Sequence, residues 1–492
     1  MSVSAQPPLE MLTPPALPPV GSLIGGKRLS GDEALRVSDC FSQQLIVQVP
    51  AATREQVALA VRTARAALGR IPPPYERARI LRRAAELIDA RRANFIDLMV
   101  AEAGFTPSDA AGELERAIDT CQLCAEEAKR ITGEMVALDG NAGQQHRLGF
   151  TLRTPVGVVC AITPFNAPLN SVIHKVGPAL AAGNAVLLKP SEHTPLTASL
   201  VCEILLEAGL PPDLLALVNG DAAVGAWLLE EQGIDFYSFT GSTRVGRLIQ
   251  AGAGLRRTQL ELGSIACTVV CADADLDHAL PRIARATFRK AGQVCTSIQR
   301  LYVERAAVAA VTERLRTEAL ALPAGNPSDA AMRIGPMITE AQARRAQGWI
   351  NEAVDGKARV ECGGDRDGLV LQATILSGVA PGMKVIDQEI FAPVVSILPF
   401  EALPEAIDSI NATPFGLATG IFTNNLTRAL AAARNIRSGG IHINETSSSR
   451  VDGMPYGGVK DSGFGREGPR YAIGEMMDEK MITLAAGGGA LR

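Results

Sequence analysis

The 492-residue sequence lacks the features that would assign it to several classes of protein. Its net charge is only −4 and it has no long basic block, which argues against nucleic acid or a membrane surface as a partner. No apolar run reaches the roughly 20 residues that span a bilayer. The first 20 residues contain six prolines but no basic stretch followed by an apolar one, so no secretory signal is predicted. We therefore expect a cytoplasmic protein.

The cysteines and histidines form no cluster that is typical of a metal centre or a disulfide framework. The nine cysteines are scattered and odd in number, so free thiols are expected. Cys121 and Cys124 form a CxxC pair, but the pair lies in a helical pattern and no second pair accompanies it. Helix packing is therefore favoured over a metal or redox role. The five histidines are dispersed, and no metal site is predicted.

Short apolar runs alternate with helical patterns through most of the chain. Residues 50–132 have apolar positions at helical spacing, and residues 134–154 contain two alternating stretches that predict a hairpin. From VGVVCAI to QLELG, strand patterns alternate with helical ones, and the alternation restarts at CTVVCAD. This order is typical of parallel sheets covered by helices on both faces. The length likewise favours two or three domains.

Three polar side chains are candidates for catalysis. Cys295 lies in AGQVCTSIQR, between a predicted helix and a predicted strand, but most cysteines are inert and a nucleophilic thiol needs a polarising environment. Asn166 and Glu261 each follow a predicted strand, at the sheet edge where α/β proteins bind ligands. An amide can donate to an oxyanion, and a carboxylate can act as a general base. Taken alone, Asn166 fits a turn equally well, and Glu261 fits a solvated strand end better.

Two further segments at strand ends suit a dinucleotide. Lys189 and Glu192, in LLKPSEHTP, follow a strand, and a carboxylate there can accept the two ribose hydroxyls of NAD while repelling a 2′-phosphate. Gly241, Ser242 and Gly246, in FTGSTRVG, could let a helix N-terminus approach a phosphate. The segment does not match G-x-G-x-x-G, and a tight strand–helix turn is an equally good interpretation.

Together these segments resemble the aldehyde dehydrogenase superfamily over residues 40–485. The motifs that carry the resemblance occur in the family's order: ITPFN, GNAVLLKPSE, FTGSTRVG, LELG, GQVC, EIFAPV, NATPFGLA and MPYGGVKDSGFGREG. They are specific for the superfamily and much less so for a substrate. The closest variants in motif are semialdehyde, lactaldehyde and phosphonoacetaldehyde dehydrogenases.

The resemblance implies an α/β fold with a Rossmann-like NAD-binding domain, a second α/β catalytic domain and a small β oligomerisation element. The implied boundaries are a proline-rich, disordered lead-in at 1–20, an NAD-binding domain at 21–132 and 155–262, a catalytic domain at 263–465, and an oligomerisation element at 133–154 and 466–492. An exposed hairpin edge is a template for pairing between chains, so a homodimer or homotetramer is expected.

The resemblance also implies roles for individual residues. Cys295 is the nucleophile, Asn166 the oxyanion donor, and Glu261 the base that activates hydrolytic water. The implied cofactor is NAD, with NADP also possible. The implied cofactor-binding positions are Ile162, Thr163, Pro164, Phe165, Lys189, Ser191, Glu192, Gly241, Ser242, Val245, Leu262, Gly263, Glu389 and Phe391.

By the same resemblance, Cys295 attacks the aldehyde, the thiohemiacetal gives up hydride to NAD, and water hydrolyses the thioester. CoA-acylating relatives lack the base, so Glu261 favours hydrolysis. A catalytically silent relative and an esterase are the alternatives. One departure concerns the base: Gly263-Ser264-Ile265 stands where the family commonly has Gly-Gly-Lys, which narrows the backbone freedom beside Glu261.

The substrate pocket is the least readable part of the sequence. His174 stands where succinate-semialdehyde relatives carry an arginine, whereas Arg300 occupies a position where several acid-semialdehyde enzymes have one. Arg116 and Arg450 are further candidates for binding an anionic group, although each is more often a structural arginine. The low aromatic content of 4% mildly disfavours a large aromatic pocket. A small polar or acid-bearing aldehyde is predicted, and a broad-specificity aliphatic or aromatic aldehyde dehydrogenase is the alternative.

Overall fold

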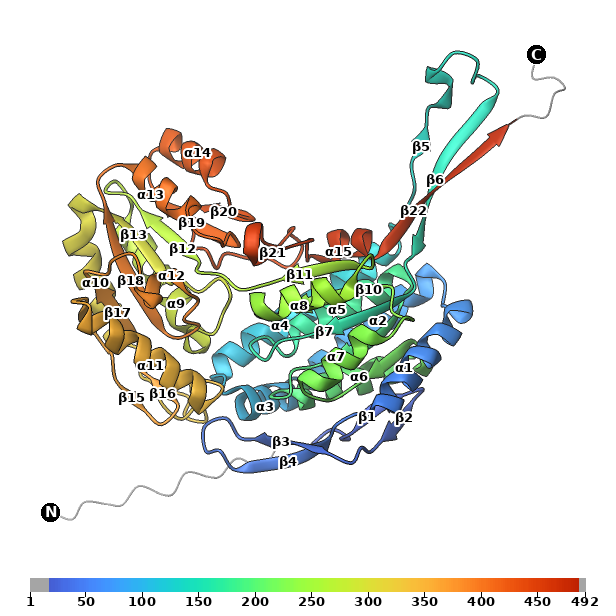
Figure 1. The fold of residues 1–492 in the computed structure, drawn as a ribbon, viewed down its shortest axis with the longest axis horizontal. Coiled ribbons are helices and arrows are strands. Elements are labelled where there is room, and N and C mark those ends of the chain that lie inside the picture. The colour runs from blue at the N-terminus through green and yellow to red at the C-terminus, as the bar shows by residue number, and fades with distance from the viewer. Residues whose placement is uncertain (1–16, 486–492) are drawn as a thin grey trace.

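The computed structural model describes residues 17–485. Most of the predicted proline-rich lead-in, residues 1–16, and the last part of the predicted oligomerisation element, residues 486–492, lie outside the described residues. The predicted α/β class is confirmed: two large sheets, each flanked by helices, form the two lobes of Figure 1. No helix of the described chain is long and apolar enough to cross a membrane.

The first sheet has a parallel centre with antiparallel edges. Its strands, in spatial order, are β2 (Lys27–Leu29), β1 (Ser22–Ile24), β9 (Leu215–Leu217), β8 (Ala185–Lys189), β7 (Val158–Ile162), β10 (Phe236–Thr240), β11 (Arg257–Glu261) and β21 (Gly463–Phe464). β7 and β8 are buried along their whole length, which is why their sequences are continuous apolar runs. From β7 the chain adds β8 and β9 on one side, and later β10 and β11 on the other, so the switch point lies between β7 and β10.

Helices cover both faces of this sheet. They are α1 (Arg54–Ala67), α2 (Pro74–Ala90), α3 (Arg92–Ala103), α4 (Pro107–Ala128), α5 (Asn170–Ala182), α6 (Pro195–Glu207), α7 (Ala222–Glu230), α8 (Thr243–Ala253) and α15 (Pro469–Glu475). α5 is buried over almost its whole surface, because α4 and α15 pack against it outside the sheet. Cys121 and Cys124 are both buried on α4, as the helix-packing interpretation expects.

The second sheet is parallel except at one edge. Its strands, in spatial order, are β14 (Arg359–Cys362), β17 (Thr374–Ser377), β18 (Val394–Phe400), β13 (Arg300–Glu304), β12 (Cys267–Val270), β19 (Ala418–Phe422) and β20 (Gly440–Ile443). Its helices are α9 (Leu276–Phe288), α10 (Val308–Leu320), α11 (Glu340–Asp355), α12 (Lys384–Asp387), α13 (Leu403–Asn411) and α14 (Leu426–Asn435). Each large sheet has its own apolar core.

Three small sheets complete the fold. Two are short pairs, β3 (Ala34–Ser38) with β4 (Leu45–Pro50) and β15 (Arg366–Asp367) with β16 (Val370–Leu371). The third is an antiparallel arm that projects from the body in Figure 1 and consists of β5 (Met135–Val136), β6 (Arg147–Pro155) and β22 (Met477–Ala485). β22 forms one edge of the arm.

The chain returns from the second lobe to the first before residue 465. β21 belongs to the stretch predicted as catalytic domain, yet it pairs antiparallel with β11 of the first sheet. Similarly, α15 belongs to the stretch predicted as oligomerisation element, yet it packs on α5. Because β21 and α15 pack on the first lobe, the segment of residues 445–467 crosses the junction of the two lobes, where it contributes to the functional site.

Candidate active site

A tight turn presents Cys295 at the end of α9. Lys290 and Ala291 adopt left-handed backbone conformations, with φ of 51° and 52°, and Gly292 follows with φ of 66°. A Cβ atom on Gly292 would lie 2.1 Å from the carbonyl oxygen of Ala392, so only glycine fits there. Consecutive left-handed residues other than glycine are unfavourable and tend to occur at functional sites. Cys295 is also the only one of the nine cysteines that is not buried.

Cys295, Glu261 and Asn166 line a single cavity of about 560 Å³. The cavity draws its walls from both lobes, because Glu261 ends β11 of the first sheet whereas Cys295 follows α9 of the second. The Asn166 side-chain amide donates to the carbonyl oxygen of Gln293 at 2.8 Å, two residues before the thiol. The three residues that the sequence selects for catalysis are therefore neighbours in space.

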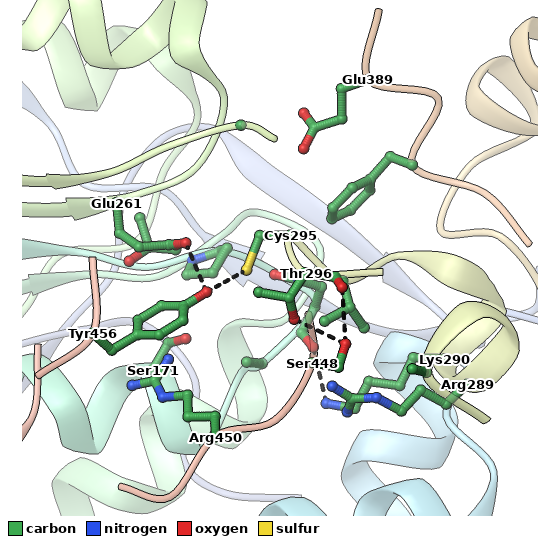
Figure 2. A pocket seen from close by; sticks show the side chains of 18 of the residues that line it. Ser171, Glu261, Arg289, Lys290, Cys295, Thr296, Glu389, Ser448, Arg450 and Tyr456 are labelled. Carbon is green, nitrogen blue, oxygen red and sulfur yellow. Dashed lines mark hydrogen bonds between the residues drawn. The ribbon is translucent and has the colours of Figure 1, made fainter. Parts of the chain in front are cut away.

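Tyr456 connects the thiol with the carboxylate. Its hydroxyl lies 3.0 Å from Cys295 Sγ and donates to Glu261 Oε1 at 3.4 Å (Figure 2). Burial, and then the negative charge of Glu467, raise the pKa of Glu261 to about 7. Burial and the neighbouring Glu261 carboxylate raise the pKa of Cys295 well above its ordinary value. Tyr456 belongs to the motif MPYGG, but nothing in the sequence alone distinguishes its hydroxyl from a core aromatic residue.

The sheet edge at the switch point holds the segments selected for a dinucleotide. Pro164, Phe165 and Asn166 follow β7 and line the cavity, and Gly241 and Ser242 follow β10 and do the same. The Ser242 hydroxyl accepts from Val245 N and caps α8. The turn between β10 and α8 therefore directs the positive end of a helix toward the cavity, as anion binding requires.

The residues that line the cavity opposite the β10–α8 turn also leave room for a ligand. Glu389 Oε1 accepts from Ser264 N at 2.8 Å, and burial raises the pKa of Glu389 to about 7. A Cβ atom on Gly263 would approach Glu389 Oε2 to 2.8 Å, so the glycine makes room for the carboxylate. The Phe391 ring meets Phe165 edge to face, with the ring centroids 6.0 Å apart. Leu262, Gly263, Glu389 and Phe391 all line the cavity.

The remaining predicted cofactor positions lie beside the cavity rather than in its lining. Ile162 ends β7, and Lys189 ends β8. Lys189 is buried and donates to Pro190 O at 3.3 Å, and its burial lowers its pKa. Glu192 is exposed, so its carboxylate is accessible to a ligand. The other positions outside the lining are Thr163, Ser191 and Val245.

Arginines on α9 and just beyond it form a cationic wall that the sequence interpretation misses. Arg282, Arg285 and Arg289 lie three and four residues apart and all line the cavity. Arg282 pairs with Glu445 at 3.5 Å, but neither Arg285 nor Arg289 makes a side-chain hydrogen bond or ion pair within residues 17–485. The spacing of the three arginines in PRIARATFRKAG is a signal that could have found them.

Two of the predicted anion-binding arginines line the cavity but already have carboxylate partners. Arg116 makes two hydrogen bonds to Asp452, at 2.7 and 3.0 Å. Arg450 donates to Glu467 at 3.0 Å, and its guanidinium carbon lies 3.8 Å from the centre of the Tyr456 ring. Arg116 and Arg450 are thus ion-paired, whereas Arg285 and Arg289 form no ion pair within the described chain.

The other two predicted substrate residues do not line the cavity. His174 is buried on α5, where its Nε2 lies 2.8 Å from Asp452 Oδ1 and 3.1 Å from Arg450. It therefore helps to position Arg450 directly and Arg116 through Asp452. Arg300 is buried at the start of β13 and donates to Ile265 O and to the Tyr302 hydroxyl. These hydrogen bonds stabilise the second sheet, and Arg300 does not line the cavity that contains Cys295.

A buried ion pair underlies the cavity. Lys175 Nζ on α5 donates to Glu467 Oε1 at 3.0 Å, with side-chain exposures of 0% and 5%. Glu467 also accepts from the Thr240 hydroxyl at the end of β10 and from Arg450. Burial alone would raise the pKa of Glu467, but Lys175 and Arg450 hold it below its ordinary value. The carboxylate thus stays ionised and ties α5, β10 and the segment around residue 450 together.

Comparison with known proteins agrees with this architecture. The fold and its cavity define an α/β protein with a binding site at the switch point of a parallel sheet. A family model described as "Aldehyde dehydrogenase family" matches residues 28–482, and the chain belongs to that family.

Three relatives illustrate the range of similarity. A 3-sulfolactaldehyde dehydrogenase of Priestia aryabhattai is 46% identical over 465 residues, covering 94% of this chain and 98% of the relative. The crystal structure of an NAD-dependent aldehyde dehydrogenase from Sinorhizobium meliloti has a TM-score of 0.92 at 35% identity, covering 96% of this chain and 95% of that one. A glyceraldehyde-3-phosphate dehydrogenase of Methanocaldococcus jannaschii, solved with NADP, has a TM-score of 0.89 at 34% identity, covering 92% and 100%.

The buried ion pair generates a prediction about stability. Lys175→Met leaves Glu467 with only part of its compensation, so we expect the free energy of unfolding to fall by about 3 kcal/mol. Lys384→Met is the matched control, because Lys384 pairs with Glu352 on the exposed surface and its loss should change stability by about 0–1 kcal/mol. Urea denaturation of both variants measures the difference, and equal losses would contradict the importance of the buried pair.

Proposed function

We propose that this enzyme oxidises a small aldehyde bearing an anionic group to the corresponding carboxylate, with NAD as cofactor. The observation that carries the proposal is the pair Arg285 and Arg289, which line the same cavity as Cys295 without a carboxylate partner in the described chain. An uncompensated guanidinium in a cavity favours an anion, which it can bind through two parallel hydrogen bonds. The relative named for 3-sulfolactaldehyde, an aldehyde with a sulfonate group, supports this choice.

Each catalytic residue has a distinct task in this reaction. The Cys295 thiolate attacks the aldehyde carbon, and the resulting alkoxide of the thiohemiacetal accepts from the Cys295 backbone N–H and from the Asn166 amide. NAD, when bound, supplies the acceptor for the hydride that leaves this carbon. Glu261 then removes a proton from a water molecule, which attacks the Cys295 thioester and releases the carboxylate. The position of Asn166 and Glu261 around one thiol supports these roles.

The residues at the switch point fit a dinucleotide. Glu192, exposed beside β8, would accept the adenosine ribose hydroxyls, with Lys189 and Ser191 beside it. Its charge disfavours a 2′-phosphate, which makes NAD the first choice and NADP the second to be assayed. Gly241, Ser242 and Val245 would receive the pyrophosphate at the start of α8. The segments 162–165, 262–263 and 389–391 would enclose the nicotinamide half.

The antiparallel arm supports the proposal that copies of this chain associate with one another. Apolar side chains on β6 and β22 are exposed, including Leu148 at 48%, Leu152 at 45% and Leu484 at 53%. Exposed apolar patches are typical of interfaces between chains, and the edge strand β22 can also pair with a strand of another chain. We therefore propose a homodimer or a homotetramer assembled through the arm. Free thiols at all nine cysteines are typical of a reducing compartment and support a cytoplasmic location.

The cationic wall predicts a charge-selective change in kinetics. Arg289→Gln should raise the KM for 3-sulfolactaldehyde and succinate semialdehyde by about tenfold to a hundredfold, because a charge-assisted hydrogen bond contributes about 1.5–3 kcal/mol. The KM for propanal, which has no anionic group, should stay unchanged. NADH formation measures both, with NADP tested in parallel. Arg344→Gln, on the exposed surface of α11, is the control, and Cys295→Ala gives the background. A wild-type enzyme that turns over only long alkyl or aromatic aldehydes would overturn the proposal.

The pKa of Glu261 predicts the pH dependence of turnover. Glu261 can accept a proton from water only when ionised, and its pKa lies near 7 rather than 4.5. Turnover should therefore be low below about pH 6, rise through pH 7 and level off above it. Glu261→Gln should remove this step and lower the turnover about a hundredfold or more. Steady-state rates across the pH range test this, and an unchanged step in the variant would assign the titration to another group.

The arm predicts the oligomeric state of a variant. Leu148 faces Leu484 across β6 and β22, and both side chains are exposed. Replacing both by lysine should dissociate the assembly into monomers, because buried lysines would lack partners at the interface. Solution scattering measures the mass. Leu320→Lys, at an exposed position on α10, should leave the assembly intact, and a monomeric wild type would refute the proposed interface.

A further inference from the structure

Tyr456 completes a chain of donors from the thiol to the carboxylate. Its hydroxyl has a single proton, and the geometry makes Glu261 Oε1 the acceptor of that proton at 3.4 Å. The 3.0 Å contact with Cys295 Sγ is then satisfied when the thiol donates to the Tyr456 oxygen. The 3.4 Å distance between the Tyr456 hydroxyl and Glu261 Oε1 is long for a hydroxyl donor, as catalytic hydrogen bonds often are before substrate binds. Figure 2 shows the Tyr456 hydroxyl between the two groups.

Two contacts, both of which involve Glu467, determine the position of the Tyr456 hydroxyl. Its backbone pairs with Glu467 in both directions, with N–O distances of 3.1 and 2.7 Å. Its ring packs against the Arg450 guanidinium, which is itself held by the Glu467 carboxylate. With an exposure of only 7%, the side chain has little freedom to leave this place. The hydroxyl is therefore held in place as a donor and acceptor before any substrate arrives.

The charges around this chain favour moving a proton within it over losing one from it. Within the described chain, the ionisable groups that face Tyr456 or its two partners are Cys295, Glu261, Glu467, Arg450, Lys175 and Arg289. Glu467 is neutralised by Lys175 and Arg450. Ionising the thiol while Glu261 keeps its charge would place two anions on either side of one hydroxyl. Transfer of the proton to Glu261 creates the thiolate with no change in the total charge.

We propose that the Tyr456 hydroxyl relays the Cys295 thiol proton to Glu261, which makes Tyr456 a fourth catalytic residue of the reaction proposed above. The Cys295 S–H bond breaks as its proton binds the Tyr456 oxygen, while the original Tyr456 proton moves to Glu261 Oε1. The products are a thiolate, a neutral tyrosine and a protonated carboxyl group. Glu261 releases this proton to solvent before it removes a proton from water in the hydrolysis step. No oxidant, reductant or other reactant takes part. The inference rests on the proposed roles of Cys295 and Glu261.

Alkylation of Cys295 by iodoacetamide tests the relay in the full-length protein without any aldehyde. The other eight cysteines are buried, and Cys295→Ala gives the background. In the wild type, the alkylation rate should rise through a step near pH 7, where Glu261 ionises and can accept the proton. In Tyr456→Phe, which keeps the ring against Arg450, the step should disappear and the rate at neutral pH should fall about tenfold or more. Tyr75→Phe, at an exposed position on α2, should behave as the wild type.

A double variant separates the relay from a merely structural effect. If both residues act on one proton, Tyr456→Phe combined with Glu261→Gln should alkylate no more slowly than Glu261→Gln alone. A Tyr456→Phe protein that keeps the step near pH 7, or additive losses in the double variant, would overturn the relay in favour of direct transfer or packing. Thermal unfolding of each variant identifies a folding defect. Because alkylation needs no aldehyde, failure of the substrate panel leaves this test intact.

Discussion

The site depends on one buried ion pair, between Lys175 on α5 and Glu467 in the segment that crosses from the second lobe back to the first. Glu467 receives hydrogen bonds from Lys175, Thr240 and Arg450, and its backbone pairs with that of Tyr456. One ionised carboxylate therefore fixes the position of a strand end, an arginine and a tyrosine around the thiol. Because two charges so deeply buried need each other, this part of the cavity has few alternative arrangements.

The same pair shapes the electrostatics of the catalytic groups. Glu467 pairs with two cations and keeps its charge. Nearby Glu261 forms no ion pair within the described chain, and burial together with the charge of Glu467 moves its pKa in the opposite direction. Two carboxylates in one environment thus differ in protonation at neutral pH, which is how a site separates a structural anion from a base. On the opposite side of the cavity, Arg285 and Arg289 supply positive charge and form no ion pair within the described chain.

The sequence predicts most of the fold and part of the site, for identifiable physical reasons. Parallel strands buried on both faces appear as continuous apolar runs, so β7 and β8 can be predicted from the sequence alone. Cys295, Asn166 and Glu261 lie in one cavity, as their positions after predicted helix and strand ends suggest, and their catalytic roles stay a prediction. Arg285 and Arg289 are missed because an arginine stripe on a helix is also typical of a solvated face. His174 and Arg300 are selected by position in a motif, but burial and hydrogen bonds within the protein occupy their polar atoms. Pairings such as β21 with β11 depend on contacts far apart in sequence.

The arm has a consequence for how the molecule is made. β6 ends at Pro155, yet its long antiparallel partner β22 begins only at Met477. During synthesis on the ribosome, β6 must wait for almost the whole remaining chain before it gains that neighbour, and meanwhile its apolar residues face water. An assembly surface built from β6 and β22 together cannot exist on an incomplete chain. In the assembly proposed above, subunits would recognise one another through this surface only after β22 has been synthesised.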